Sequence, residues 1–257
     1  MKHQNYFSKK NEKAAAAKRH VDEMARIFPE RISLSVKNAT IYDEEPLTRG
    51  FSDNRIPCIV EEIDSVSAVI EYAEMGSKAC VLNFASYKQA GGMYLSGSIA
   101  QEECLCAEST LYNVLSQFEA DYYEPNRSEL NRALYKNRAL YTPEIAFARD
   151  YDNIVFCDVL TCAAPNFKAA HTYQKVTREE NYEVLKSRIY YVLNIMENEG
   201  VKVPILGAFG CGVFDQDAHE VASIFKTLLD EYDYSFEKVV FAVIPGPNAD
   251  AFKAVFA

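Results

Sequence analysis

The sequence has no long apolar run. No stretch approaches the roughly 18 consecutive apolar residues that suggest a membrane-spanning helix, and the opening MKHQNYFSKKNEKAAAAKRH has no apolar core of the kind found in secretory signals. We therefore expect neither a membrane span nor secretion.

Positive charge is also scarce. Lysine and arginine number 27 against 37 aspartate and glutamate residues, for a formal net charge of -10 at pH 7. A protein that binds nucleic-acid backbone needs clustered basic residues in excess, so direct backbone binding is not expected. A nucleotide-sized ligand held by backbone N–H groups stays compatible with this acidity.

The seven cysteines include no Cys-x-x-Cys pair, and four of them lie in apolar runs. An odd number of scattered, apolar-flanked cysteines is typical of reduced thiols rather than of disulfides or a zinc site. We expect a cytoplasmic protein without a bound metal.

Apolar residues are plentiful, at 49% of the chain, so a sizeable core is available. Periodicity predicts helices over 11–28, 65–76, 98–118, 177–200 and 217–232, and strands in 31–42, 78–85, 153–166, 201–214 and 237–246. The tyrosine-rich stretch 121–150 is expected to cover the surface near the ligand mouth. The alternation predicts one three-layer α/β domain over residues 1–257 with parallel pairing, in which residues 1–45 form an N-terminal extension of helix and strand.

Two predicted strands run into glycine-rich loops that each lead to a helix. Such loops at the carboxyl ends of strands let backbone N–H groups approach phosphate oxygens. The first loop has a P-loop-like spacing from Gly92 to Gly97 but lacks the lysine that follows in a P-loop, and neither loop contains Gly-x-Gly-x-x-Gly. The pair of loops favours a ligand that contains pyrophosphate.

Two adjacent carboxylates, Glu102 and Glu103, follow the first loop. One interpretation is purely structural: Ser98 and Gln101 form a capping box, and acidic residues suit a helix N-terminus. The second interpretation is chemical, because neighbouring carboxyl groups can raise a pKa for general acid catalysis. Adjacent helical residues point about 100° apart, so the two carboxylates should take different roles.

Three segments together resemble a known family. VLNFASYKQAGGMYLSGSIAQEE is similar to the signature of the microbial, macrodomain-type poly(ADP-ribose) glycohydrolases, and TCAAPN and GAFGCGVF resemble that family's later motifs in the same order. The resemblance spans roughly residues 10 to 250. It implies a macrodomain-like fold with a central mixed sheet between helices and an N-terminal helical extension. It also implies a hydrolase that cleaves the ribose–ribose O-glycosidic bond of poly(ADP-ribose), without cofactor or metal.

The resemblance carries site roles onto matching positions. The second glutamate of the family's Gln-Glu-Glu is the catalytic acid and the first binds hydroxyls of the distal ribose, which implies these roles for Glu103 and Glu102. Implied substrate-binding residues are Asn83, Gly91, Gly92, Gln101, Gly210, Cys211, Gly212, Val213 and Phe214, the last pressing on the distal ribose. The implied partners are ADP-ribose, poly(ADP-ribose) and ADP-ribosylated macromolecules.

Met93 departs from the family, which has a glycine there as the third of a triplet. Its side chain could narrow the approach to the distal ribose, or it could turn inward and fill a gap in the core.

The function also allows more than one interpretation. The chain could be a binding module that does not cleave its ligand, although the retained carboxylates favour an enzyme. It could act on single ADP-ribose units rather than on polymer. Cys211 could be a nucleophile or a small residue packed under its loop.

Overall fold

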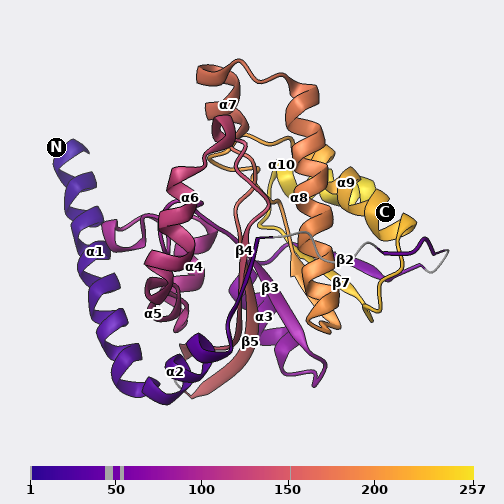
Figure 1. Cartoon of the computed structure of the whole chain (residues 1–257). Helices are drawn as coiled ribbons and strands as arrows, with labels where there is room; N and C mark the ends of the chain where they lie inside the picture. Colours follow the sequence, from indigo (N-terminus) through magenta and orange to yellow (C-terminus); the bar gives the residue numbers. More distant parts are fainter. Residues whose placement is uncertain (1, 44–48, 53–54, 151) are drawn as a thin grey trace.

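A seven-stranded mixed sheet lies at the centre of the computed structural model, which describes residues 2–43, 49–52, 55–150 and 152–257 (Figure 1). The strand order is β1-β4-β5-β3-β6-β7-β2. β4 runs antiparallel to both neighbours, and the remaining pairs are parallel. The strands are β1 (Thr40–Tyr42), β2 (Cys58–Glu61), β3 (Ala79–Phe84), β4 (Ala139–Asp150), β5 (Asn153–Cys162), β6 (Val203–Leu206) and β7 (Val239–Ala242).

Helices cover both faces of this sheet, which confirms the predicted three-layer α/β arrangement and the mixed sheet that the resemblance implies. The parallel pairing predicted from the alternation is wrong for β4, which pairs antiparallel with β1 and β5. One core contains Cys80 and Leu82 of β3 together with α8, α9 and α10, and the second contains Ala79 and Val81 together with α3, α4 and α5. Side chains of a strand alternate between the faces, so β3 contributes to both cores. The principal helices are α1 (Lys2–Ile27), α2 (Pro29–Asn38), α3 (Ser65–Ala73), α4 (Gln101–Ala107), α5 (Leu111–Leu115), α6 (Glu124–Ser128), α7 (Phe167–Gln174), α8 (Arg178–Asn198), α9 (Ala218–Glu231) and α10 (Pro247–Phe256).

The N-terminal segment is mostly helical, and the strand predicted over 31–42 is wrong in most of its length. Pro29 stands at the start of α2, where its missing N–H costs nothing. Ile32 and Val36, four residues apart, pack on the core, whereas Leu34 between them is 40% exposed. The helical spacing therefore prevails over the alternating pattern, and only β1 is extended.

The single helix predicted over 98–118 is also wrong, because it is interrupted near Ser109. There the backbone pairs with β4: the N–H of Thr110 donates to the carbonyl of Ala146 and that of Ala148 to Glu108. Ser109 forms an isolated bridge with Phe147 and its hydroxyl bonds the carbonyl of Leu105. These pairings to β4 take the place of helical hydrogen bonds, so α4 and α5 are separate short helices.

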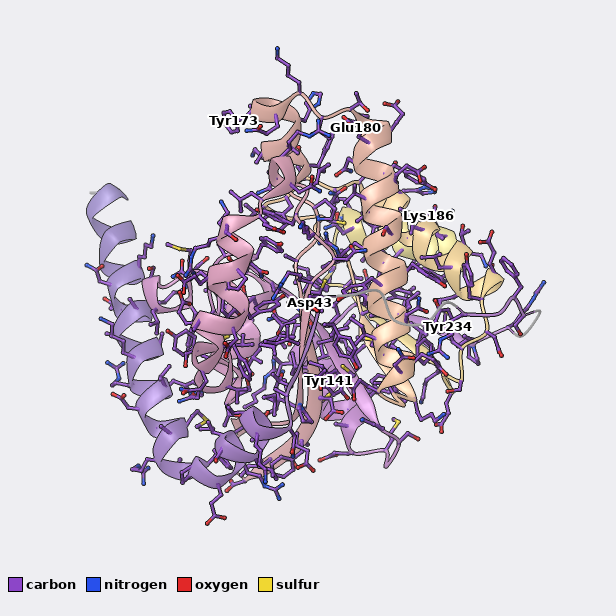
Figure 2. All side chains as sticks on the ribbon, in the orientation of Figure 1. Asp43, Tyr141, Tyr173, Glu180, Lys186 and Tyr234 are labelled. Carbon is purple, nitrogen blue, oxygen red and sulfur yellow. The ribbon has the colours of Figure 1, made fainter. Side chains whose placement is uncertain are left out.

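The second half of the stretch 121–150 is internal, contrary to the prediction that the whole stretch covers the surface, whereas residues 127–132 are exposed as predicted. The second half is β4, a twelve-residue strand with a register shift between Thr142 and Ile145. Pro143 lies within that shift, as proline in a sheet usually does. Tyr141 sits in the middle of the molecule, 2% exposed, whereas Tyr173 projects from α7 at the end of the molecule (Figure 2).

Several more predicted elements agree with the structure. β3, α3 and α9 lie within the predicted ranges. α8 begins with a capping box between Thr177 and Glu180, and Gly200 follows its end with φ +70°. Among the described residues, no helix combines the length and the apolar character needed to cross a bilayer.

Candidate active site

Three loops meet at the carboxyl ends of the central strands because β3, β5 and β6 are parallel neighbours. They are residues 85–100 after β3, 163–166 after β5 and 207–217 after β6. The amide of Gln216 donates to the carbonyl of Pro165 at 2.7 Å, which joins the second and third loops. The carboxyl ends of parallel strands are the usual ligand site of open α/β sheets. The two glycine loops predicted from the sequence therefore do come together.

The first loop turns around both carboxylates. Gly92 has φ +56°, and a Cβ atom built on it would lie 2.7 Å from Oε1 of Glu103 and 2.9 Å from Oε2 of Glu102. A side chain there would displace one or both carboxyl groups. Glycine is needed at this position for its backbone conformation and for the space that it leaves to the two acids.

Glu102 is buried at the strand end, with 3% of its surface exposed. Its Oε2 accepts a hydrogen bond from the N–H of Ser86 at 2.7 Å, and its Oε1 accepts one from the amide of Asn83 at 3.3 Å. Burial raises the pKa of Glu102 to about 8, and the neighbouring Glu103 carboxylate acts in the same direction. The two hydrogen bonds lower that pKa but do not offset burial. At neutral pH this carboxyl group holds its proton.

This raised pKa predicts a pH-dependent stability. The folded protein holds the Glu102 proton up to about pH 8, whereas the unfolded chain releases it near pH 4.5. The native state binds more protons between these values, so the free energy of unfolding falls as the pH rises through that window. Glu102→Gln removes the ionisation. We therefore compare the free energy of unfolding of the variant with that of wild type at each pH. The variant's value minus the wild-type value should be larger at pH 8 than at pH 5, by on the order of a few kcal/mol.

Thermal unfolding of both proteins at the two pH values measures this effect. Glu183→Gln, at an exposed position of α8, is the matched control and should show no such pH dependence. An equal stability difference between wild type and Glu102→Gln at both pH values would contradict the assignment of the proton to Glu102.

Glu103 is buried to a similar degree, with 6% of its surface exposed. Its Oε1 accepts a hydrogen bond from the backbone N–H of Met93 at 2.9 Å. Unlike Glu102, it borders a hollow of about 250 Å³ between α4 and α1. Of the two acids, Glu103 is therefore the one with open space beside it.

Met93 itself is 50% exposed and has φ -103°, a conformation open to any residue. The interpretation that its side chain fills a gap in the core is therefore wrong. Its contribution to the loop is the backbone N–H that binds Glu103.

Gln101 is bound to the sheet by its side chain. Its Oε1 accepts the N–H of Phe84 at 2.8 Å, and its Nε2 donates to the carbonyl of Leu82 at 2.9 Å. The predicted capping box is wrong, because Ala100 is the N-cap of α4 and no side chain caps that end. Tertiary contacts occupy the amide instead, and they hold α4 against the end of β3.

Asn83 lies behind Glu102 rather than at the surface, with none of its side chain exposed. Its Nδ2 donates to Glu102 and, at 3.2 Å, to the hydroxyl of Thr161. Its Oδ1 has no hydrogen-bond partner among the described residues. The structure thus brings Asn83 to the acid pair, and its direct contact with a ligand stays a prediction.

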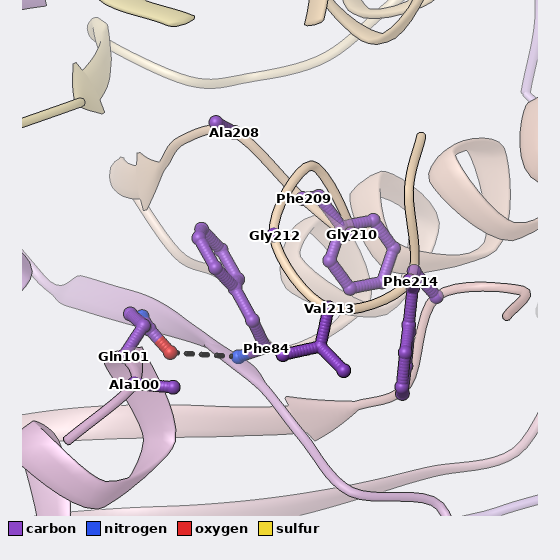
Figure 3. A pocket seen from close by; sticks show the side chains of 10 residues that line it. Phe84, Ala100, Gln101, Ala208, Phe209, Gly210, Gly212, Val213 and Phe214 are labelled. Carbon is purple, nitrogen blue, oxygen red and sulfur yellow. Dashed lines mark hydrogen bonds between the residues drawn. The ribbon is translucent and has the colours of Figure 1, made fainter. Parts of the chain in front are cut away.

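The third loop forms a hollow of about 150 Å³ against the start of α4 (Figure 3). Phe84 and Gln101 stand on one side of it, and Phe214 stands on the opposite side beyond Val213 (Figure 3). The side chain of Val213 is 76% exposed. Phe84, Gln101, Phe209, Gly210, Gly212, Val213 and Phe214 all line this hollow.

Cys211 belongs to the same loop but does not line the hollow. Burial raises the pKa of its thiol to about 12, and the carboxylate of Asp217 acts in the same direction. A thiol with so high a pKa carries almost no thiolate at neutral pH, so the structure favours the packing role over a nucleophile.

Two features of the site were not recognised in the sequence. Arg188 of α8 is fully buried, and it donates to Oδ1 of Asn137 at 2.7 Å, to the carbonyl of Leu134 at 3.4 Å and to the carbonyl of Ala163. These acceptors are neutral, so the guanidinium charge beneath the second loop is solvated by dipoles. An arginine among Leu185, Ile189 and Val192 on the apolar face of α8 was the available signal.

The second unrecognised feature is an aromatic group. Tyr87 and Tyr135 stack with ring centroids 4.3 Å apart, and Phe214 meets the edge of Tyr135 at 6.1 Å. Both tyrosines are at most 5% exposed, so the surface position expected for the stretch 121–150 is wrong at Tyr135. The rings support the side of the third loop on which Phe214 lies.

No group of three or more histidine, cysteine, aspartate or glutamate side chains with the geometry to hold a metal ion occurs in the described ranges.

Comparisons with known proteins agree with this geometry. The family model described as "Microbial-type PARG, catalytic domain", where PARG stands for poly(ADP-ribose) glycohydrolase, matches residues 3–150, more than half of the 257-residue chain. No curated protein matches the chain.

Solved structures match over nearly the whole length. The poly(ADP-ribose) glycohydrolase of Thermomonospora curvata bound to the inhibitor ADP-HPD is 28% identical, with a TM-score of 0.78 over 95% of this chain and 99% of that chain. The poly(ADP-ribose) glycohydrolase of Deinococcus radiodurans in complex with ADP-ribose is 30% identical, with a TM-score of 0.78 over 87% of this chain and 96% of that chain.

Proposed function

The chain belongs to the microbial-type poly(ADP-ribose) glycohydrolases, and from this premise we propose how its residues cleave the ribose–ribose O-glycosidic bond. One observation carries the proposal: two buried carboxylates converge on Gly92 at the carboxyl end of β3. One of them, Glu102, retains its proton at neutral pH because burial raises its pKa to about 8. Cleaving a glycosidic bond requires a proton on the leaving oxygen, and such a carboxyl pair can hold one.

Glu103 is proposed as the general acid because it has open space beside it. The proton that the carboxyl pair holds passes through Glu103 to the bridging oxygen as the bond between that oxygen and the anomeric carbon breaks, and the electron pair of the bond stays on the oxygen. The ribose passes through an oxocarbenium-like state, and water then adds to the anomeric carbon. The proton that this water releases restores the acid.

Glu102 is proposed to bind the distal ribose hydroxyls. Its two hydrogen bonds, from Ser86 and Asn83, fix its orientation. Gln101 positions both acids through its bonds to β3, because it anchors the first turn of α4. Catalytic groups that are held in this way lose little freedom when substrate binds.

The hollow along the third loop is proposed to receive the diphosphate, with Phe214 against the distal ribose. Backbone N–H groups of Gly210, Gly212 and Val213 are the candidate donors in that loop, because the N–H of Cys211 already donates to the carbonyl of Ala208 at 3.1 Å. ADP-ribose bound to the Deinococcus radiodurans protein supports the same ligand here. We further propose a cytoplasmic location, which the seven free cysteines support, and ADP-ribosylated macromolecules as the natural targets.

Release of free ADP-ribose tests the activity directly. The protein is incubated with poly(ADP-ribose) and, separately, with a mono-ADP-ribosylated peptide. We expect free ADP-ribose to be released from the polymer. Binding of ADP-ribose with no release from either substrate would mean a binding module instead. Release from the peptide alone would mean a hydrolase of single ADP-ribose units.

Gly212→Val tests the third loop. A Cβ atom on Gly212 meets no atom within 4 Å among the described residues, and its φ lies outside the left-handed region. Valine should therefore leave thermal stability near that of wild type, yet occupy space at the edge of the hollow. We expect the Kd for ADP-ribose to rise by about tenfold or more, which corresponds to about 1.4 kcal/mol. Calorimetry gives the Kd, and unchanged affinity would show that the loop is only a turn.

Gly210→Val is the contrasting variant. Its Cβ would lie 2.7 Å from Cβ of Ala164 and 2.9 Å from Cγ of Gln216, at φ +78°. This variant should lose fold stability, which Gly212→Val should not.

A further inference from the structure

A second hollow, of about 250 Å³, lies between α1 and the segment that carries the acid pair. Glu103 borders it on the α4 side. On the α1 side it is bordered by Lys13 and Ala16, and Ile99 and Ala107 add apolar surface. In Figure 1, α1 lies outside α4 and α5, on the side away from α8. The hollow is separate from the one along the third loop, and α4 begins between them.

The α1 wall of this hollow is fixed in place. A Cβ atom on Gly97 would collide with the carbonyl oxygen of Lys10, so the two backbones are in direct contact. Further along α1, the amide of Asn113 donates to the carbonyl of Val21 at 2.9 Å. The helix therefore contacts the loop before α4 near one end of the hollow and α5 near the other, so the wall of the hollow is held by two fixed contacts.

The reaction defines what should lie beside Glu103. A general acid gives its proton to the leaving oxygen, so the leaving group must lie next to the acid. In poly(ADP-ribose) the leaving group is the 2′-oxygen of an adenosine that remains in the polymer. An apolar wall suits the faces of a purine, and the ammonium group of Lys13 suits the adjoining phosphate.

We propose that this hollow is the leaving-group subsite, which receives the adenosine of the polymer segment released when the bond breaks. The proposal rests on the proposed function and specifies it further. The volume is below the roughly 300–1,000 Å³ of pockets for whole drug-sized ligands, which suits one nucleoside better than a complete ADP-ribose unit. The N-terminal helix would then recognise substrate, favouring polymer over substrates with a small leaving group.

Two alanines provide a matched test. Ala16 borders the hollow, whereas its neighbour Ala15 is also exposed but does not border it. Ala16→Trp should fill the hollow, and Ala15→Trp should not. The readout is kcat/KM for poly(ADP-ribose) divided by kcat/KM for ADP-ribose that carries a nitrophenyl leaving group on the same anomeric carbon. We expect this ratio to fall about tenfold or more in Ala16→Trp, a change of about 1.4 kcal/mol, and to stay at the wild-type value in Ala15→Trp.

A second pair tests the charge. Lys13→Ala should lower the same ratio and weaken its dependence on salt, whereas Lys18→Ala, at an exposed position that does not border the hollow, should do neither. Equal ratios in Ala16→Trp and Ala15→Trp, together with an unchanged ratio in Lys13→Ala, would overturn the proposal. A wild-type protein that cleaves neither substrate would instead refute the proposed function, so the two failures are distinguishable.

Discussion

Glu103→Gln is expected to lower turnover of poly(ADP-ribose) by about 10²–10⁴-fold, the usual contribution of general acid catalysis. Glutamine keeps the size of the side chain and can still accept the hydrogen bond from Met93. Because only the proton donor is lost, binding of ADP-ribose should stay close to that of wild type. Turnover on polymer and calorimetric affinity for ADP-ribose measure the two effects on one variant.

The control for this variant is Glu183→Gln on the exposed side of α8, which should cleave polymer like wild type. Turnover of Glu103→Gln within about threefold of wild type would be far below the loss that general acid catalysis implies, and would remove Glu103 from this role. A loss of ADP-ribose affinity to the same extent as turnover would indicate a binding role instead.

Gly92→Ala should have the second large effect. The added Cβ would lie 2.7 Å from Oε1 of Glu103 and 2.9 Å from Oε2 of Glu102. Carboxyl groups at the ends of flexible side chains can move aside, so the fold should survive. A displacement of about 1 Å in catalytic groups can reduce the rate by about 10²-fold, and we expect a loss of that size in kcat.

Gly76→Ala separates the clash from backbone strain. Gly76 also has positive φ, +84°, but a Cβ there meets no atom within 4 Å among the described residues. Both variants should lose about 1–2 kcal/mol of stability from the left-handed conformation. Only Gly92→Ala should lose turnover. If the two variants keep equal activity, the contact between Gly92 and the acids has no catalytic importance.

The periodic elements could be predicted because their local signals agree with their packing. α8 has a capping box at its start and a glycine after its end, and β3 is an apolar run buried on both faces. β4 was missed because Pro143 and the charged Glu144 interrupt its pattern. Both residues lie at a register shift, where a strand tolerates them.

The acid pair could be predicted from its motif, but its electrostatics could not. The pKa of Glu102 depends on burial at the strand end and on the N–H of Ser86, and neither is local in sequence. The contacts of the Gln101 side chain could not be predicted from its sequence neighbours either. Its spacing from Ser98 satisfies a local capping rule, yet its amide binds the backbone of β3 instead.

Arg188 couples the local opening of the two segments that it binds, residues 134–137 and the loop after β5. Its guanidinium is held by Leu134, Asn137 and Ala163, which belong to two separate segments, and no carboxylate in the described part of the chain pairs with it. A buried cation that loses its acceptors is costly, so neither segment can detach from α8 alone at low free energy. Local opening must release both together and admit water to the charge. In amide hydrogen exchange, the backbone around these residues should therefore exchange as one cooperative unit.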